Sequence, residues 1–118
     1  MAAAPIVYFE FAGPDVAALG EFYASVFEWP IGSGGQIPAA QAGAPRGGLR
    51  ADPPATVLYL GVPDITATLA AITHAGGAVM IPRTVVPGVG TFALFRDPGG
   101  NVVGLAESGS FVAGASAS

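Results

Sequence analysis

The sequence predicts an α+β fold built from two similar modules, each consisting of a strand, a helix and three further strands. One observation is an internal repeat, in which Pro14–Val16 recurs as Pro63–Ile65 after an apolar, strand-like run. The others are a helical spacing of apolar residues after each repeat and three short strand-like runs near the C-terminus. We expect a single domain over residues 1–108, with modules at about 5–51 and 55–108.

Each helix is predicted to begin after the Asp of the repeat, because an N-cap carboxylate accepts hydrogen bonds from the free amides of the first turn. Apolar residues follow Asp15 at three- and four-residue spacing, which predicts a helix packed on a sheet: Val16, Leu19, Phe22, Tyr23, Val26 and Phe27. After Asp64 the pattern is weaker and consists of Ile65, Leu69 and Ile72. Gly76–Gly77 would end this second helix in a left-handed conformation.

The strands of the second module are predicted at residues 78–84, 90–96 and 101–107, with breaks at Pro87–Gly88 and Asp97–Gly100. The corresponding segment of the first module, residues 29–51, is rich in Gly, Pro and Ala, so its strands should be short and partly mobile. Residues 109–118 have little to bury and are expected to form a flexible tail.

Composition and charge argue against several classes of function. Four Lys and Arg residues against eight Asp and Glu give a net charge of −4 without a basic cluster, so we expect no nucleic-acid partner. The absence of cysteine excludes disulfides, a thiolate nucleophile and Cys-based zinc sites. There is no basic segment before the N-terminal apolar stretch, and no apolar run of roughly 18 residues that would span a bilayer. We therefore expect a cytoplasmic protein without a membrane partner.

Two segments carry a resemblance to a known family, namely PDVAALGEFYASVFEW at residues 14–29 and FRDPGGNVVGL at residues 95–105. Together with the repeated module, they make the chain similar to the vicinal oxygen chelate superfamily of glyoxalases, extradiol dioxygenases and bleomycin-resistance proteins. The resemblance covers residues 5–108 and implies a curled, partly open mixed sheet around a cavity. It also implies a homodimer, which agrees with a chain of which only 10% of the residues are charged.

The resemblance further implies three metal-ligand positions, which in this chain are Tyr8, Val57 and Gly104. Val57 and Gly104 have no donor atom in their side chains, and a phenol with a pKa of about 10 is a poor ligand for a divalent cation. We therefore expect no metal and no other cofactor. Glyoxalase activity is not expected either, because in this family it depends on the metal.

Few other residues could replace these ligands. The only histidine, His74, falls in the last turn of the second predicted helix, where it could simply face solvent at the helix C-terminus. A single histidine excludes a two-histidine site within one chain. Glu10 and Glu107 remain as carboxylates, but a site built from them alone would depart from the family pattern.

Strand alternation predicts which side chains face the cavity that the resemblance implies. If the metal-ligand positions point inward, the inward-facing residues are Tyr8, Glu10, Val57, Tyr59, Val102, Gly104 and Ala106. They would form a pocket with two phenols, one carboxylate and a small apolar floor. Such a pocket suits a small organic ligand with an aromatic or aliphatic body and one donor or positive charge. Gly104 would widen this cavity or allow close approach of the backbone.

Each polar candidate also has a structural alternative. Tyr8 and Tyr59 could be core aromatics with their hydroxyl groups at the rim. Glu10 lies among apolar strand residues, so it must be solvated, functional or paired with Arg46, Arg50, Arg83 or Arg96. If Glu10 is buried, its pKa is expected to rise toward the range of a general base. Arg96 could bind an anionic ligand or pair with Asp97.

Four functions follow as hypotheses. The favoured one is a metal-independent protein that sequesters an aromatic or amphipathic compound, because three ligand positions lack good donors and the predicted cavity is aromatic and apolar. The second is a metal-independent isomerase or lyase with Glu10 as general base and Tyr8 or Tyr59 as acid. The third is a metal-dependent enzyme of glyoxalase or dioxygenase type with atypical ligands. The fourth is an interaction or regulatory module whose own side chains fill the cavity.

Overall fold

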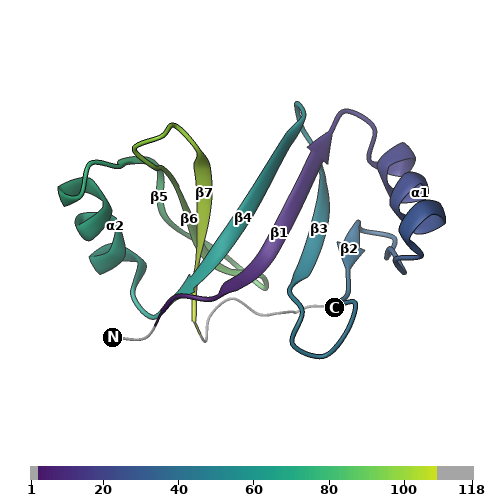
Figure 1. Cartoon of the computed structure of the whole chain (residues 1–118), viewed down its shortest axis with the longest axis horizontal. Helices are drawn as coiled ribbons and strands as arrows, with labels where there is room; N and C mark the ends of the chain where they lie inside the picture. The colour runs from purple at the N-terminus through teal and green to yellow at the C-terminus, as the bar shows by residue number, and fades with distance from the viewer. Residues whose placement is uncertain (1–2, 109–118) are drawn as a thin grey trace. The chain divides into compact units, whose positions relative to one another are not determined.

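The structure is a computed structural model, and it describes residues 3–108. It contains two helices together with strands that pair in both parallel and antiparallel fashion, so the predicted α+β fold class is confirmed (Figure 1). Contacts divide the described residues into a first unit, Val7–Leu58, and a second unit, residues 3–6 with residues 59–108. The predicted tail at 109–118 lies outside the described residues. Within residues 3–108, no helix has the length and apolar character needed to cross a bilayer.

The first unit contains most of β1 (Ile6–Gly13), then α1 (Val16–Phe27), β2 (Gln36–Ile37), β3 (Arg46–Ala51) and the start of β4 (Ala55–Val62). Strand β3 runs parallel to β1 and antiparallel to β2. Between α1 and β4 the structure has only β2 and β3. The chain between them turns at Gly43, whose φ of 87° favours glycine, so the Gly-rich segment supplies turns instead of a further strand.

Helix α1 begins as predicted but packs less fully than predicted. The Asp15 carboxylate accepts a hydrogen bond from the Ala18 amide at 3.0 Å, which confirms the N-cap. No residue of α1 is buried, and Phe22, Val26 and Phe27 are each more than half exposed. The prediction that the whole apolar stripe faces a sheet is therefore wrong. The sheet covers this helix mainly through β3, so the rest of the stripe stays exposed.

The second unit holds the rest of β4, α2 (Ile65–His74), β5 (Ala78–Val86), β6 (Gly90–Arg96) and β7 (Val102–Glu107). The strand order is β4-β7-β6-β5, with β4 parallel to β7 and the other pairs antiparallel. The three strands predicted near the C-terminus are thus confirmed. Helix α2 contacts β5, β6 and β7 (Figure 1). The core between helix and sheet consists of Val62, Ile65, Leu69, Ala93, Phe95 and Leu105.

Both ends of α2 follow the predicted chemistry. The Asp64 carboxylate accepts a hydrogen bond from the Ala67 amide at 3.0 Å and caps the first turn. At the other end Gly76 has a φ of 102°, and the Gly77 amide donates to the Ile72 carbonyl at 2.8 Å. His74 is the last helical residue and is exposed, which confirms its solvent-facing interpretation.

Candidate functional site

A polar cluster of four residues, Tyr8, Glu10, Arg50 and Asp52, lies on the β1–β3 sheet of the first unit. Arg50 Nη1 donates to Glu10 Oε1 at 2.5 Å, so of the four arginines of the chain it is Arg50 that pairs with Glu10. The Arg50 Nε atom lies 2.7 Å from Asp52 Oδ2, an ion-pair contact without hydrogen-bond geometry. The Glu10 side chain is only 17% exposed, so its ion pair is partly shielded from water.

Strand alternation places this cluster on the face of β1 opposite α1. Phe11 points toward the helix, because its ring stacks on Tyr23 with a centroid distance of 5.0 Å and an interplanar angle of 3°. Glu10 therefore points to the other face, and its register partner on β3 is Gly48. The Tyr8 hydroxyl lies directly over Gly48, since a Cβ atom there would overlap it. Gly48 thus makes room for the phenol beside the carboxylate.

The surroundings of Tyr8 keep its phenol protonated. Burial raises the pKa of Tyr8 above its ordinary value, the negative charge of Glu10 raises this pKa further, and Arg50 partly opposes both effects. At neutral pH the hydroxyl is therefore a hydrogen-bond donor. The cluster combines this neutral donor with two carboxylates and one guanidinium, which gives it one net negative charge.

Gly104 in the second unit has a different role from the predicted widening of a cavity. It is the register partner of Tyr59 across the β4–β7 pair, and both residues are buried. A Cβ atom at Gly104 would lie 2.7 Å from Tyr59 Cγ and closer still to the edge of the ring. The Tyr59 ring therefore covers Gly104, and the space that a larger side chain would need there is filled.

The residues at the three positions that the sequence resemblance implies do not form a donor set that fits a metal ion. Val57 is buried and has no donor atom, Tyr59 covers Gly104, and the pKa of Tyr8 is raised, which disfavours a phenolate ligand. Among residues 3–108, no group of three or more His, Asp or Glu side chains is arranged to hold a metal. His74 ends α2 on the exposed surface of the second unit.

Arg96 and Glu107 have structural partners in the second unit. Arg96 Nη1 donates to the Gly100 carbonyl at 3.0 Å, so it braces the turn after β6, and no contact with Asp97 carboxylate oxygens is seen within the described chain. Glu107 accepts two hydrogen bonds from Arg83, at 2.7 and 3.2 Å, and one from the Ile65 amide at 2.9 Å. The Glu107 carboxylate therefore ties β5 and β7 to the N-terminus of α2.

The structure brings only part of the predicted pocket set together. Tyr8 and Glu10 are neighbours in the first unit, which also contains Val57, whereas Tyr59 and Gly104 pack on each other in the second. The sequence interpretation missed Gly48 and Asp52. A signal for Gly48 was available, because a Gly-Gly pair in a strand beside an aromatic strand indicates that rings lie over the glycines.

Comparisons with known proteins identify the fold. No family model and no curated protein matches the sequence. A hypothetical protein from Bacillus halodurans C-125 has a TM-score of 0.71 at 11% identity, over 94% of this chain and 99% of that chain. A variant of methylmalonyl-CoA epimerase from Streptomyces coelicolor, in complex with 2-nitronate-propionyl-CoA, has a TM-score of 0.66 at 15% identity, over 92% of this chain and 100% of that chain. The chain has the glyoxalase-like fold.

A second epimerase agrees with this assignment. Methylmalonyl-CoA epimerase from Mycobacterium tuberculosis has a TM-score of 0.66 at 14% identity, and the match covers 91% of each chain. The resemblance seen in the sequence is therefore confirmed at the level of the fold.

Proposed function

We propose that this chain is a metal-independent protein that binds a small aromatic or amphipathic compound. The observation that carries the proposal is the placement of Glu10, a largely shielded carboxylate in an apolar strand, beside Tyr8 on the face of β1 opposite α1. An ion pair that is only partly shielded from water contributes little net stability in general, which favours a role in recognition. The glyoxalase-like fold supports the same conclusion, since matched structures of this fold hold small organic ligands.

The charges of the polar cluster define the class of ligand. Glu10 and Asp52 together outweigh Arg50, and the Tyr8 hydroxyl is a neutral donor. A ligand with a positive charge or hydrogen-bond donor would face the carboxylates, and an acceptor on the same ligand would face Tyr8. We therefore expect an amine or similar donor joined to an aromatic body.

A metal-independent isomerase or lyase is the second candidate. It is favoured by the proximity of a carboxylate, Glu10, and a protonated phenol, Tyr8, which could act as base and acid on one substrate. Solved structures of the same fold include epimerases with acyl-CoA ligands, which supports isomerisation next to a carbonyl as the reaction class. In this candidate, Glu10 would take a proton from the substrate carbon and Tyr8 would donate to the carbonyl oxygen.

Equilibrium dialysis with phenethylamine and phenylacetate tests the proposal. We expect the amine to bind in preference to the carboxylate, and Tyr8→Phe, which removes one hydrogen bond, to weaken binding by about two- to tenfold. Glu10→Gln should weaken amine binding more strongly, whereas the exposed Glu28→Gln control should bind like the unchanged protein.

Two results would decide against binding as the sole function. If Tyr8→Phe and Glu10→Gln bind phenethylamine with the same affinity as the unchanged protein, the ligand does not bind at the polar cluster. Proton exchange or isomerisation of a bound carbonyl compound, lost in Glu10→Gln while binding persists, would establish the enzyme instead.

A further inference from the structure

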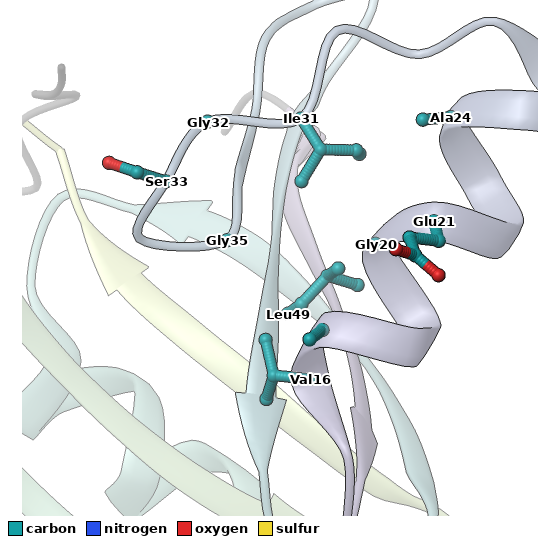
Figure 2. Close-up of a pocket in the computed structure, with 10 residues that line it drawn as sticks. Val16, Gly20, Glu21, Ala24, Ile31, Gly32, Ser33, Gly35 and Leu49 are labelled. Atoms are coloured by element: carbon teal, nitrogen blue, oxygen red, sulfur yellow. The ribbon is translucent and has the colours of Figure 1, made fainter.

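A hollow of about 270 Å³ lies in the first unit between α1 and the loop that leads into β2 (Figure 2). Figure 2 shows Ile31 and Leu49 directed toward the helix, and Glu21 on the same helical stretch as Gly20. The hollow is lined by Val16, Ala17, Gly20, Glu21, Ala24, Ile31, Gly32, Ser33, Gly35 and Leu49. It is separate from the polar cluster, because Leu49 and Arg50 point to opposite faces of β3.

The rim of the hollow is held in place by hydrogen bonds. The Gly32 amide donates to the Gln36 carbonyl at 2.8 Å, and the Gly35 amide donates to the Gly32 carbonyl at 2.9 Å. The Leu49 amide donates to the Gly35 carbonyl at 2.9 Å and joins the loop to β3. Gly35 has a φ of 85°, and a Cβ atom there would lie 2.9 Å from the Leu49 carbonyl oxygen, so glycine is required. The hollow is therefore preformed.

Its floor is apolar and narrow. A Cβ atom at Gly20 would lie 3.6 Å from Ile31 Cγ2 and 3.7 Å from Leu49 Cδ1, which is ordinary van der Waals contact. Helix and sheet therefore lie so close at Gly20 that no ligand atom can enter between them, and Gly20 forms part of the closed floor of the hollow. An alkyl chain would lie in the hollow above this apolar floor, and its burial would be favourable in proportion to the apolar area removed from water.

Glu21 gives the hollow its charge. Its carboxylate lies at the rim and has no hydrogen bond or ion pair with any residue among 3–108. No Lys, Arg or His lines the hollow, and the chain as a whole carries a net charge of −4. The electrostatic field of Glu21 and that of the whole negatively charged chain therefore both favour a cation at this rim.

We propose that this hollow is a second binding site, which takes a small alkylammonium group with its chain over Gly20 and its charge beside Glu21. The volume is slightly below that of typical drug-sized pockets, so the ligand class is a short aliphatic amine. The ion pair between Glu21 and the ammonium group of the ligand would be exposed to solvent. Most of the affinity would therefore come from the alkyl chain, and the charge would supply selectivity for amines.

Titration with n-butylammonium, followed by amide shifts in NMR spectra, tests this site. We expect saturable shifts at Gly20, Gly32 and Gly35, and much weaker shifts with butyrate. Glu21→Gln should weaken n-butylammonium binding by about two- to fivefold, as expected for an exposed ion pair. Ala24→Leu should fill the mouth and abolish the saturable shifts, whereas Ala70→Leu, at an exposed position on α2, should leave them unchanged.

The proposal is overturned if these amides show no saturable shifts, if butyrate binds as tightly as n-butylammonium, or if Ala24→Leu and Ala70→Leu behave alike. The Tyr8→Phe variant separates this site from the polar cluster. Binding in the hollow should persist in Tyr8→Phe, and amine binding to the polar cluster should persist in Ala24→Leu, so that either proposal can fail without the other.

Discussion

At the scale of single residues, several strand glycines are covered by aromatic side chains. Gly104 lies under Tyr59, Gly47 under Phe9 and Gly48 under the Tyr8 hydroxyl. A ring over a strand glycine covers backbone that would otherwise face solvent or an empty space. At Gly104, which the sequence resemblance implies as a metal-ligand position, the structure shows this packing contact.

The Gly104–Tyr59 contact predicts that any side chain at position 104 destabilises the fold. Gly104→Ala should lower the free energy of unfolding by about 1–3 kcal/mol, because its Cβ atom would overlap the buried ring. Urea unfolding measures this, with Gly99→Ala as control, since a Cβ atom at Gly99 meets only ordinary contacts. In the double variant Tyr59→Ala/Gly104→Ala, part of the Gly104→Ala cost should disappear. Equal stability of Gly104→Ala and the unchanged protein would contradict the prediction.

At the scale of elements, the two helices begin with the same cap but differ in how they are held. Helix α2 buries Ile65 and Leu69 in the core of the second unit, and its first turn receives a second carboxylate, Glu107, from β7. Helix α1 has neither feature; it contacts β3, and its Tyr23 ring stacks on Phe11 and on Trp29. We infer that α2 opens less readily than α1.

The Glu107 contacts predict a dependence of stability on pH. Hydrogen bonds from Arg83 first, and from the Ile65 amide second, lower the pKa of Glu107 below its ordinary value. A lowered folded-state pKa contributes stability above the unfolded-state pKa of about 4.3, and this contribution is lost as the pH falls through the folded-state value. Glu107→Gln should therefore be less stable than the unchanged protein at pH 7, and the difference should shrink toward acid pH.

Thermal unfolding between pH 7 and pH 3 measures this effect, with the exposed Glu28→Gln as the matched control. A gap between Glu107→Gln and the unchanged protein that stays constant across this range would show that the carboxylate charge plays no part.

At the scale of the whole molecule, exposed apolar side chains predict self-association. Phe22, Val26 and Phe27 are 51%, 56% and 54% exposed on α1, and such a group is larger than the isolated apolar residues common on monomers. We expect a homodimer that buries this face, with twice the 11.6 kDa mass of one chain. Sedimentation equilibrium measures the mass, and Phe22→Ser should shift it toward the monomer.

Val85 is 59% exposed on β5 and provides the comparison, because Val85→Thr should leave the dimer intact. Dissociation by Val85→Thr alone would place the interface on the second unit, and a monomer at all concentrations would refute self-association.

Local patterns were sufficient to predict the fold class, both N-caps, the stop at Gly76 and the strands after α2. These features depend on residues a few positions apart, whose spacing and turn chemistry are visible in the sequence. The repeat and the two motifs also predicted the glyoxalase-like fold. Tyr8 and Glu10 could be named as neighbours because strand alternation is itself a local rule.

Contacts between residues distant in the chain were decided only by the tertiary structure. The β1–β3 register selected Arg50 as the partner of Glu10, and the β4–β7 register placed Tyr59 over Gly104. The hollow beside α1 likewise depends on how the Gly-rich loop meets Leu49. The physical reason is that strand register and side-chain packing are set by the free energy of the whole fold, which no local pattern of residues encodes.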